Sequence, residues 1–361
     1  MKLLSVIPFI FLFSECISQN YIIEIDQGKL NGTTKYDRKG GVFYSFQSIP
    51  YGKPPVGELR FKVSQPADKW DGVRDASVDM PMCYQLIDWQ NRPQSEDCLY
   101  LNVYTPQLLP SSEVGFLGCP IIETQTENRT VFLPDKPISL IQQGTFNHVS
   151  LLIGYNDIDG AGSTDIYTET VNLVLRDLGI EAGTQEAADF IDRIEDFYMT
   201  SGLFDEPLVQ MYTDIWFGYP PYRAAKEQQK VSNSSIYFYK FSADTALNLH
   251  KAEAADLRQY KGAVHSDELC YIFNSTKHNN ITIEPGSVED IAIDRVVKLW
   301  TNFVKYGNPT PDNTASFEWA SITNDIFNYV DIGTKETVPG TNPDETNMIF
   351  WETIYEEYLS K

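Results

Sequence analysis

The apolar residues of the N-terminal third fall in short runs that predict β-strands. Tyr21–Ile25 and Gly41–Phe46 are rich in β-branched and aromatic residues, and polar residues around Asn31-Gly32 and Arg38–Gly40 separate them. We interpret this region as strands of a meander joined by polar turns. Leu99–Tyr104 alternates between apolar and polar residues, which is typical of a strand with one buried face.

Further along the chain, strands and helices alternate. Val149–Tyr155 and Ser235–Phe241 are nearly continuous apolar runs, typical of buried parallel strands, and Phe327–Val330 predicts a last short strand. Apolar residues at helical spacing predict helices between and after these strands, over Thr170–Leu178, Gln185–Met199, Leu208–Phe217, Ser287–Tyr306 and Phe350–Leu359. Alternating strands and helices indicate the α/β class.

The N-terminus has the pattern of a secretory signal peptide. Lys2 supplies the basic end, Leu3–Phe13 is an apolar run, and Cys16–Ser18 offers small residues for cleavage. We predict cleavage after Ser18, so that residues 1–18 are removed, 19–361 form the mature domain, and the product is secreted. No later stretch is apolar enough to span a bilayer.

Composition and charge narrow the choice of partners. The 361 residues are 42% apolar and 13% aromatic, which is typical of a globular chain, and the formal net charge is −22. Such a chain repels nucleic acid and anionic membranes. We interpret the charge as a source of solubility; attraction of cationic substrates is the alternative. The sequence contains neither paired histidines at metal-ligand spacing nor a nucleotide-binding glycine motif, so we expect no metal and no cofactor.

The cysteines and glycosylation motifs agree with a secreted protein. Cys83 and Cys98 bracket a short polar segment, which in a secreted chain indicates a disulfide-closed loop rather than two buried thiols. Cys119 and Cys270 have no assignable partners; they either pair with each other or one has lost its mate. The N-x-S/T motifs predict glycosylation sites at Asn31, Asn128, Asn233, Asn274 and Asn280.

Several segments, in order, resemble the secreted carboxylesterase and cholinesterase family. Ile49–Phe61 resembles its I-P-Y-x-x-P-P-V-G-x-L-R-F string, Glu96–Pro106 reads E-D-C-L-Y-L-N-V-Y-T-P, and Gly262–Leu269 resembles its histidine loop. The resemblance implies an α/β-hydrolase fold and ester hydrolysis through a Ser-His-Asp/Glu acyl-enzyme mechanism. It also implies an ion pair between Arg60 and Glu96, in which the guanidinium grips the carboxylate through two parallel hydrogen bonds.

The same resemblance assigns an acid and a base. Asp159 stands where the family usually has glutamate, and His265 matches the catalytic histidine. Without the resemblance, the Asp159-Gly160 pair would be interpreted as a surface turn. The other histidines, His148, His250 and His278, are interpreted as structural or solvated.

The nucleophile is missing from the sequence. None of the 22 glycines is followed two residues later by serine, so no G-x-S-x-G motif exists. Gly160–Ser163 imitates the motif out of register, and Ser266 adjoins His265 in a way that rarely presents two side chains to each other. The chain passes from Pro106 through Leu108–Ser112 to Cys119–Glu123, a string that resembles the far side of the family's serine segment. We therefore expect an internal deletion near residues 107–118.

Loss of a triad serine lowers turnover by roughly a factor of a million. We accordingly predict an α/β-hydrolase that lacks central strands and is inactive as written, being a truncated isoform or an incomplete gene model; only a full-length form would take a small-molecule ester. Buried strands bordering the deletion should be left with open edges. The alternative is a non-catalytic secreted binding or adhesion protein of the same family. Retention of Asp159 and His265 favours the enzyme lineage.

Overall fold

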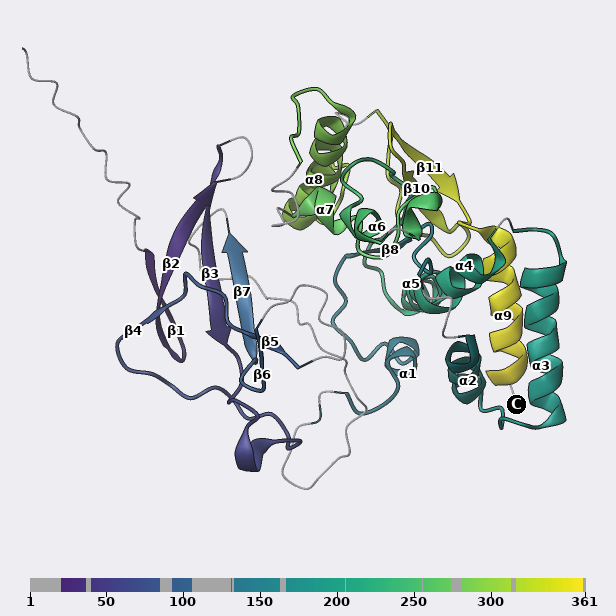
Figure 1. Ribbon diagram of the computed structural model, residues 1–361, viewed down its shortest axis with the longest axis horizontal. Coiled ribbons are helices and arrows are strands. Elements are labelled where there is room, and N and C mark those ends of the chain that lie inside the picture. The colour runs from purple at the N-terminus through teal and green to yellow at the C-terminus, as the bar shows by residue number, and fades with distance from the viewer. Residues whose placement is uncertain are drawn as a thin grey trace, which may run out of the picture. The chain divides into compact units, whose positions relative to one another are not determined.

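The computed structural model describes residues 21–36, 40–84, 93–105, 131, 133–162, 167–204, 206–254, 256–273, 281–312 and 316–359. The chain divides into two compact units, Met1–Pro120 and Ile121–Lys361 (Figure 1). The boundary falls within the string Cys119–Glu123, where the sequence predicts the end of a deletion. Each unit is described separately.

The N-terminal unit is built around an antiparallel sheet. Its strands are β1 (Tyr21–Ile25), β2 (Gly28–Tyr36), β3 (Val42–Pro50) and β7 (Tyr100–Thr105), with β4 (Val73–Asp75) parallel to β2 and a separate pair β5 (Met82–Cys83) and β6 (Gln94–Ser95). A small apolar cluster that includes Leu30, Phe46, Ile49 and Ala76 packs on this sheet. The strands predicted at both ends of this unit are confirmed.

The turn predicted at Asn31-Gly32 is wrong, because both residues lie inside β2. The chain instead reverses at Asp26-Gln27, between β1 and β2. Gly32 occupies a strand position for a packing reason: a Cβ there would lie 2.5 Å from the Phe46 ring. Glycine in a strand interior often marks such a close approach. Of the second predicted turn, Arg38 and Lys39 lie outside the described residues.

The C-terminal unit contains a four-stranded sheet in the order β11-β10-β9-β8. Strands β8 (Leu151–Asn156), β9 (Ile236–Phe241) and β10 (Asn328–Ile332) are parallel, and β11 (Thr337–Thr341) is antiparallel to β10. The sequence did not predict β11, whose central Pro339 opposes strand propensity and suits an edge. In the part of the chain that the structure describes, β8 pairs only with β9, although its L-L-I-G-Y run is typical of an interior strand.

Helices surround this sheet. They are α1 (Pro137–Gln142), α2 (Tyr167–Leu178), α3 (Gln185–Glu195), α4 (Pro207–Tyr212), α5 (Tyr219–Val231), α6 (Leu249–Glu253), α7 (Leu269–Ile272), α8 (Val288–Tyr306) and α9 (Glu345–Leu359). The limits of α8 follow from its caps: Ser287 accepts the Asp290 amide, and Gly307 ends the helix at φ 64°. Figure 1 shows α9 beside α3, where Arg193 pairs with Glu357.

The alternating side chains of β9 divide the core into two clusters. Ile236 and Phe238 pack into a cluster with residues of α2, α3, α5 and α9. Tyr237 and Phe241 point to the opposite face and pack into a cluster with residues of α8. Successive side chains of a strand face opposite sides, so a strand this apolar requires cover on both faces. The resulting layers confirm the α/β class.

Two predicted helices continue through wider turns than expected. After α3 the chain forms a π-helical turn at Asp196–Thr200, and between α4 and α5 it forms another at Thr213–Gly218. Pro220 and Pro221, at the start of α5, lack the amide hydrogens that a regular α-helix would use to bond the preceding turn. The second π-helical turn directly adjoins the candidate site.

Candidate active site

The acid of the site lies on the turn that follows β8. Asp159 is 5% exposed, and its Oδ2 accepts a hydrogen bond from the Asn156 amide at 2.7 Å. The next residue must be glycine because the π-helical turn approaches closely: a Cβ on Gly160 would lie 2.3 Å from the Thr213 nitrogen. The Gly160 amide donates to Thr213 Oγ1 at 2.9 Å. These contacts fix the turn that carries the carboxylate.

The structure brings His265 to this carboxylate. Its Nδ1 lies 3.0 Å from Asp159 Oδ1, and its ring centroid is 4.7 Å from that of Phe217 on the π-helical turn. A carboxylate only accepts hydrogen bonds, so Nδ1 carries the proton and Nε2 is left as the basic nitrogen of the neutral ring. The His265 side chain is 63% exposed. The pair therefore has the geometry of an oriented base that solvent and small molecules can reach.

Asn156 and Glu268 join the two halves of the site, a role that sequence reasoning missed. Asn156 Nδ2 donates to the Val264 carbonyl at 2.8 Å and to Glu268 Oε2 at 2.6 Å. Asn156 thus joins the acid turn to the histidine loop at two points, the backbone carbonyl of Val264 and the carboxylate of Glu268. Burial raises the pKa of Glu268, while the Asn156 hydrogen bond acts in the opposite direction.

The Asp159 hydrogen bond raises the pKa of His265 above its ordinary 6.5, and the partial desolvation of the ring opposes this effect. We expect Asp159→Asn to lower that pKa, because the imidazolium loses its anionic partner. The folded chain holds the His265 proton more tightly than the unfolded chain does. The stability that this confers is therefore present below the ordinary histidine pKa and is lost as pH rises through the folded value.

Selective labelling of the four histidines followed by an NMR titration measures this change directly. The decrease in the free energy of unfolding that Asp159→Asn causes should be larger at about pH 5 than at about pH 9. Glu268→Gln is the graded control, because the charge of Glu268 contributes least among the groups that raise the pKa of His265. An unchanged His265 titration in Asp159→Asn would contradict the pairing.

Within the described part of the chain, no hydroxyl forms a hydrogen bond with the His265 ring. Ser266 follows the histidine in a left-handed conformation, with φ 68°, and its backbone carbonyl accepts the Leu269 amide. Ser163 lies outside the described residues. Of the other histidines that the structure describes, His148 stacks on Phe146, and His250, in α6, donates its backbone amide to Asp267. His278 also lies outside the described residues.

In the N-terminal unit, Cys83 and Cys98 form a disulfide, and Arg60 and Glu96 form an ion pair. Both guanidinium contacts, from Nε and Nη2, reach the same oxygen, Glu96 Oε1, so the two-oxygen grip expected from the sequence is not formed. The side chains are 55% and 31% exposed, and exposed pairs contribute at most about 1 kcal/mol. Cys270 is a buried thiol of the C-terminal unit, and Cys119 lies outside the described residues.

The two glycosylation motifs that the structure describes differ in accessibility. Asn233 is exposed after the end of α5, whereas Asn31 is half-buried in β2 and its Oδ1 is buried. Asn128, Asn274 and Asn280 lie outside the described residues. Of the two, only Asn233 presents a side chain that an enzyme could readily modify.

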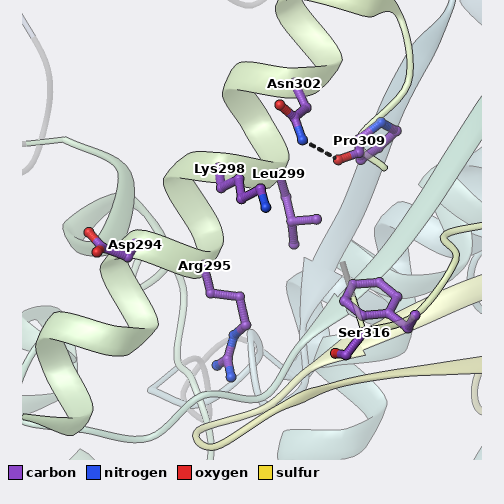
Figure 2. Close-up of a pocket in the computed structure, with 8 residues that line it drawn as sticks. Asp294, Arg295, Lys298, Leu299, Asn302, Pro309 and Ser316 are labelled. Carbon is purple, nitrogen blue, oxygen red and sulfur yellow. Dashed lines mark hydrogen bonds between the residues drawn. The ribbon is translucent and has the colours of Figure 1, made fainter. Parts of the chain in front are cut away.

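The described residues contain no group of three or more histidine, cysteine or acidic side chains placed to hold a metal ion. A cavity of about 260 Å³ lies along α8, lined by residues that include Arg295, Leu299 and Phe317 (Figure 2). It has no residue in common with the His265 pair. No helix among the residues described here has the length and apolar character needed to cross a membrane.

Both the sequence and the fold are similar to those of known esterases. The sequence is similar to a juvenile hormone esterase of Tribolium castaneum, 43% identical over 91 residues that make up 23% of this chain and 16% of that protein. It is also similar to esterase E4 of Myzus persicae, 38% identical over 119 residues, or 32% of this chain and 21% of that protein. The matches therefore span about a fifth of the length of these relatives.

The fold is similar to the crystal structure of juvenile hormone esterase from Manduca sexta with OTFP covalently attached. The TM-score is 0.74 at 17% identity, with 94% of this chain and 100% of that chain covered. This likeness shows the α/β-hydrolase fold. The model of the carboxylesterase family matches residues 19–116 and 112–351, which together make up most of the sequence. The chain is therefore a member of the carboxylesterase family.

Proposed function

We propose that this chain carries the acid and the base of a carboxylesterase centre without its nucleophile, and that it hydrolyses no ester as it stands. The observation that supports this most directly is the 3.0 Å contact between His265 Nδ1 and Asp159 Oδ1, in a sequence without a G-x-S-x-G motif. In a complete centre, the imidazole Nε2 takes the proton of the attacking serine, and the carboxylate stabilises the imidazolium that forms. Here no hydroxyl among the described residues bonds to the His265 ring, and the sequence holds no serine in a G-x-S-x-G motif.

An internal deletion explains this incompleteness. The family model matches the chain in two segments that meet at residues 112–116, close to the passage from Pro106 to Cys119 at which the sequence suggests missing residues. Strand β8, with its interior-type sequence, stands at the end of its sheet in the described residues. We infer that a form containing the missing segment hydrolyses small-molecule carboxylic esters by the acyl-enzyme route.

The relatives indicate the chemical class of the substrate but not which compound it is. They are named for different substrates, as a juvenile hormone esterase, an acylcarnitine hydrolase and an acetylcholinesterase. The chemistry common to them is the carboxylic ester, which is the class we assign to the complete form. A role in binding alone would not require the retained pairing of His265 with Asp159, so we favour the enzyme lineage.

We further propose that residues 1–18 are removed and that the chain is secreted with a glycan on Asn233. The Cys83–Cys98 disulfide supports an oxidising compartment, and the exposure of Asn233 supports its modification. Expression in a secretory host, followed by N-terminal sequencing and enzymatic deglycosylation of the product, tests this. Retention of the chain inside the cells would contradict it.

The secreted product is then treated with a fluorophosphonate probe and assayed with a simple p-nitrophenyl ester. We expect no covalent labelling, and turnover at least about a million-fold below that of a complete family member. His265→Gln is the matched control, because any hydrolysis that survives this substitution does not come from the proposed base. Labelling of a serine that His265→Gln abolishes would show that a nucleophile is present.

A further inference from the structure

The three residues before His265 are held in place by three carboxylates. Gly262–Val264 is a buried backbone segment. In chain order, its amides donate to Asp244 Oδ2 at 3.1 Å, Asp157 Oδ1 at 2.7 Å and Asp267 Oδ2 at 3.1 Å. Hydrogen bonds from backbone amides to ionised carboxylates are shorter and stronger than neutral ones. Two of these carboxylates, Asp244 and Asp157, lie outside the histidine loop, so the position of His265 depends in part on contacts from elsewhere in the fold.

Asp157 differs from the other two carboxylates because it shares a turn with the acid of the site. It directly follows β8 and lies two residues before Asp159. Its contact with the Ala263 amide is the shortest of the three. The carboxylate also lies against Gly262, where φ is +105° and a Cβ would be 2.3 Å from Asp157 Oδ2. One turn therefore binds both the imidazole and the backbone that leads to it.

We propose that Asp157 is a positioning residue, which binds the Ala263 amide and thereby holds the His265 ring on Asp159. The purpose of this arrangement rests on the proposed function, since an aligned base matters for ester chemistry. The contact itself does not depend on whether the chain is active. Asp157 accepts the Ala263 amide and Asp159 binds the His265 ring, while the Ile158 amide donates to the Ala263 carbonyl at 3.3 Å. Among these contacts from the turn, that of Asp157 is the one that holds the Ala263 amide.

The surroundings of Asp157 support the assignment and supply a second measurement. Burial raises the pKa of Asp157 to about 7, against the lowering effects of the Ala263 hydrogen bond and of Lys240; Asp331 and Asp344 raise it further. Lys240, on β9, pairs with Asp344 at 2.7 Å. The charge of Asp157 therefore changes near neutral pH, within reach of the backbone that it binds.

The decisive comparison is between Asp157→Ala and Asp157→Asn in the full chain. Both remove the charge, but only asparagine keeps an oxygen that can accept from the Ala263 amide. We expect the His265 pKa, followed by NMR, to fall towards its ordinary range in Asp157→Ala and to stay close to the wild-type value in Asp157→Asn. Equal shifts in both variants would show an effect of charge alone and would overturn the proposal.

A second measurement decides the matter if Asp157→Ala does not fold. In the unmodified chain, the chemical shift of the Ala263 amide should titrate near pH 7, and Asp157→Asn should abolish that transition. An Ala263 chemical shift with no such transition in the unmodified chain would overturn the proposal. Asp331→Asn is the matched control. The charge of Asp331 acts on the pKa of Asp157, but its carboxylate accepts a hydrogen bond from Ser242 and not from the histidine loop. This substitution should leave the His265 titration unchanged. None of these experiments measures hydrolysis. The proposed function, which the fluorophosphonate probe tests, can therefore fail while the role of Asp157 stands, and the reverse.

Discussion

Replacement of Asp214 by alanine is expected to lower the free energy of unfolding of the C-terminal unit by about 3–5 kcal/mol, because three buried donors lose their acceptor. Asp214 is 0% exposed and accepts hydrogen bonds from Tyr198, Asn347 and Gln210 at 2.7, 2.8 and 2.9 Å. Alanine leaves these donors buried without an acceptor. Each buried group that loses its partner costs about 1–3 kcal/mol.

The loss extends beyond the direct partners of Asp214. The Tyr198 hydroxyl accepts a hydrogen bond from the Trp351 indole at 2.7 Å, so a movement of Tyr198 also affects α9. Both rings belong to the larger core cluster of the unit. A chain of hydrogen bonds in a buried site acts as a unit, which is why we expect a value well above the average for a single substitution.

The effect of this substitution should depend on pH. Burial raises the pKa of Asp214 from 3.8 to about 7, so the folded chain binds its proton more tightly than the unfolded chain. The corresponding stability is fully present below the ordinary pKa and is lost as pH rises through the folded value. Asp214→Ala removes this dependence. The difference from wild type should therefore be larger at about pH 5 than at about pH 8.

Urea unfolding, followed by the fluorescence of the tryptophans, measures both effects. Asp214→Asn keeps one accepting oxygen and should cost less than alanine. Asp192→Ala removes an exposed aspartate from α3 and should change stability by less than about 0.5 kcal/mol. If Asp214→Ala were no more destabilising than Asp192→Ala, the buried network would contribute nothing to folding.

The elements that the sequence predicted well are those specified by local chemistry. Helix α8 has a serine cap, acidic residues in its first turn and a glycine stop, all within its own segment. Strand β9 was recognised because its apolar run needs cover on both faces, and it has that cover. In both cases, residues close together in the sequence carry the whole signal.

The errors arose where distant residues decide the local structure. Asn31-Gly32 has the composition of a turn, yet the Phe46 ring on a neighbouring strand requires glycine inside β2. The wider turn at Thr213–Gly218 has a local cause in Pro220 and Pro221, but its contact with the acid turn, between Thr213 and Gly160, joins residues 53 apart and has no local signal. Propensity describes a residue in isolation, and tertiary contacts override it.

The candidate site was predictable in its acid and base but not in its supporting contacts. Asp159 and His265 were assigned through matches to family segments. Their separation of 106 residues gives no local pattern that would pair them. The contact of Asp157 with Ala263 also joins residues 106 apart, and no motif marks it. Only the fold shows that one turn after β8 reaches both the histidine and its backbone.

Removal of the Cys83–Cys98 disulfide is expected to have the second large effect, on the N-terminal unit. The two cysteines are 15 residues apart, and a loop of this size contributes about 3 kcal/mol by restricting the unfolded chain. The apolar cluster of this unit has few fully buried side chains, among them Leu30 and Phe46. A small core leaves little reserve of stability, so a loss of this size should open the sheet measurably.

Hydrogen exchange of the full chain, resolved by peptide, tests this prediction for each unit separately. In the double variant Cys83→Ser and Cys98→Ser, the amides of β3 and β7 should exchange faster by roughly a hundred-fold, which corresponds to about 3 kcal/mol. Strand β7 begins two residues after Cys98, so the loop closure lies next to the strand that it supports. A reductant should produce the same change in the unmodified chain and none in the double variant. Cys119→Ser, which removes a cysteine outside this loop, should exchange like wild type. Equal protection of β3 and β7 in all five samples would show that the crosslink does not stabilise the sheet.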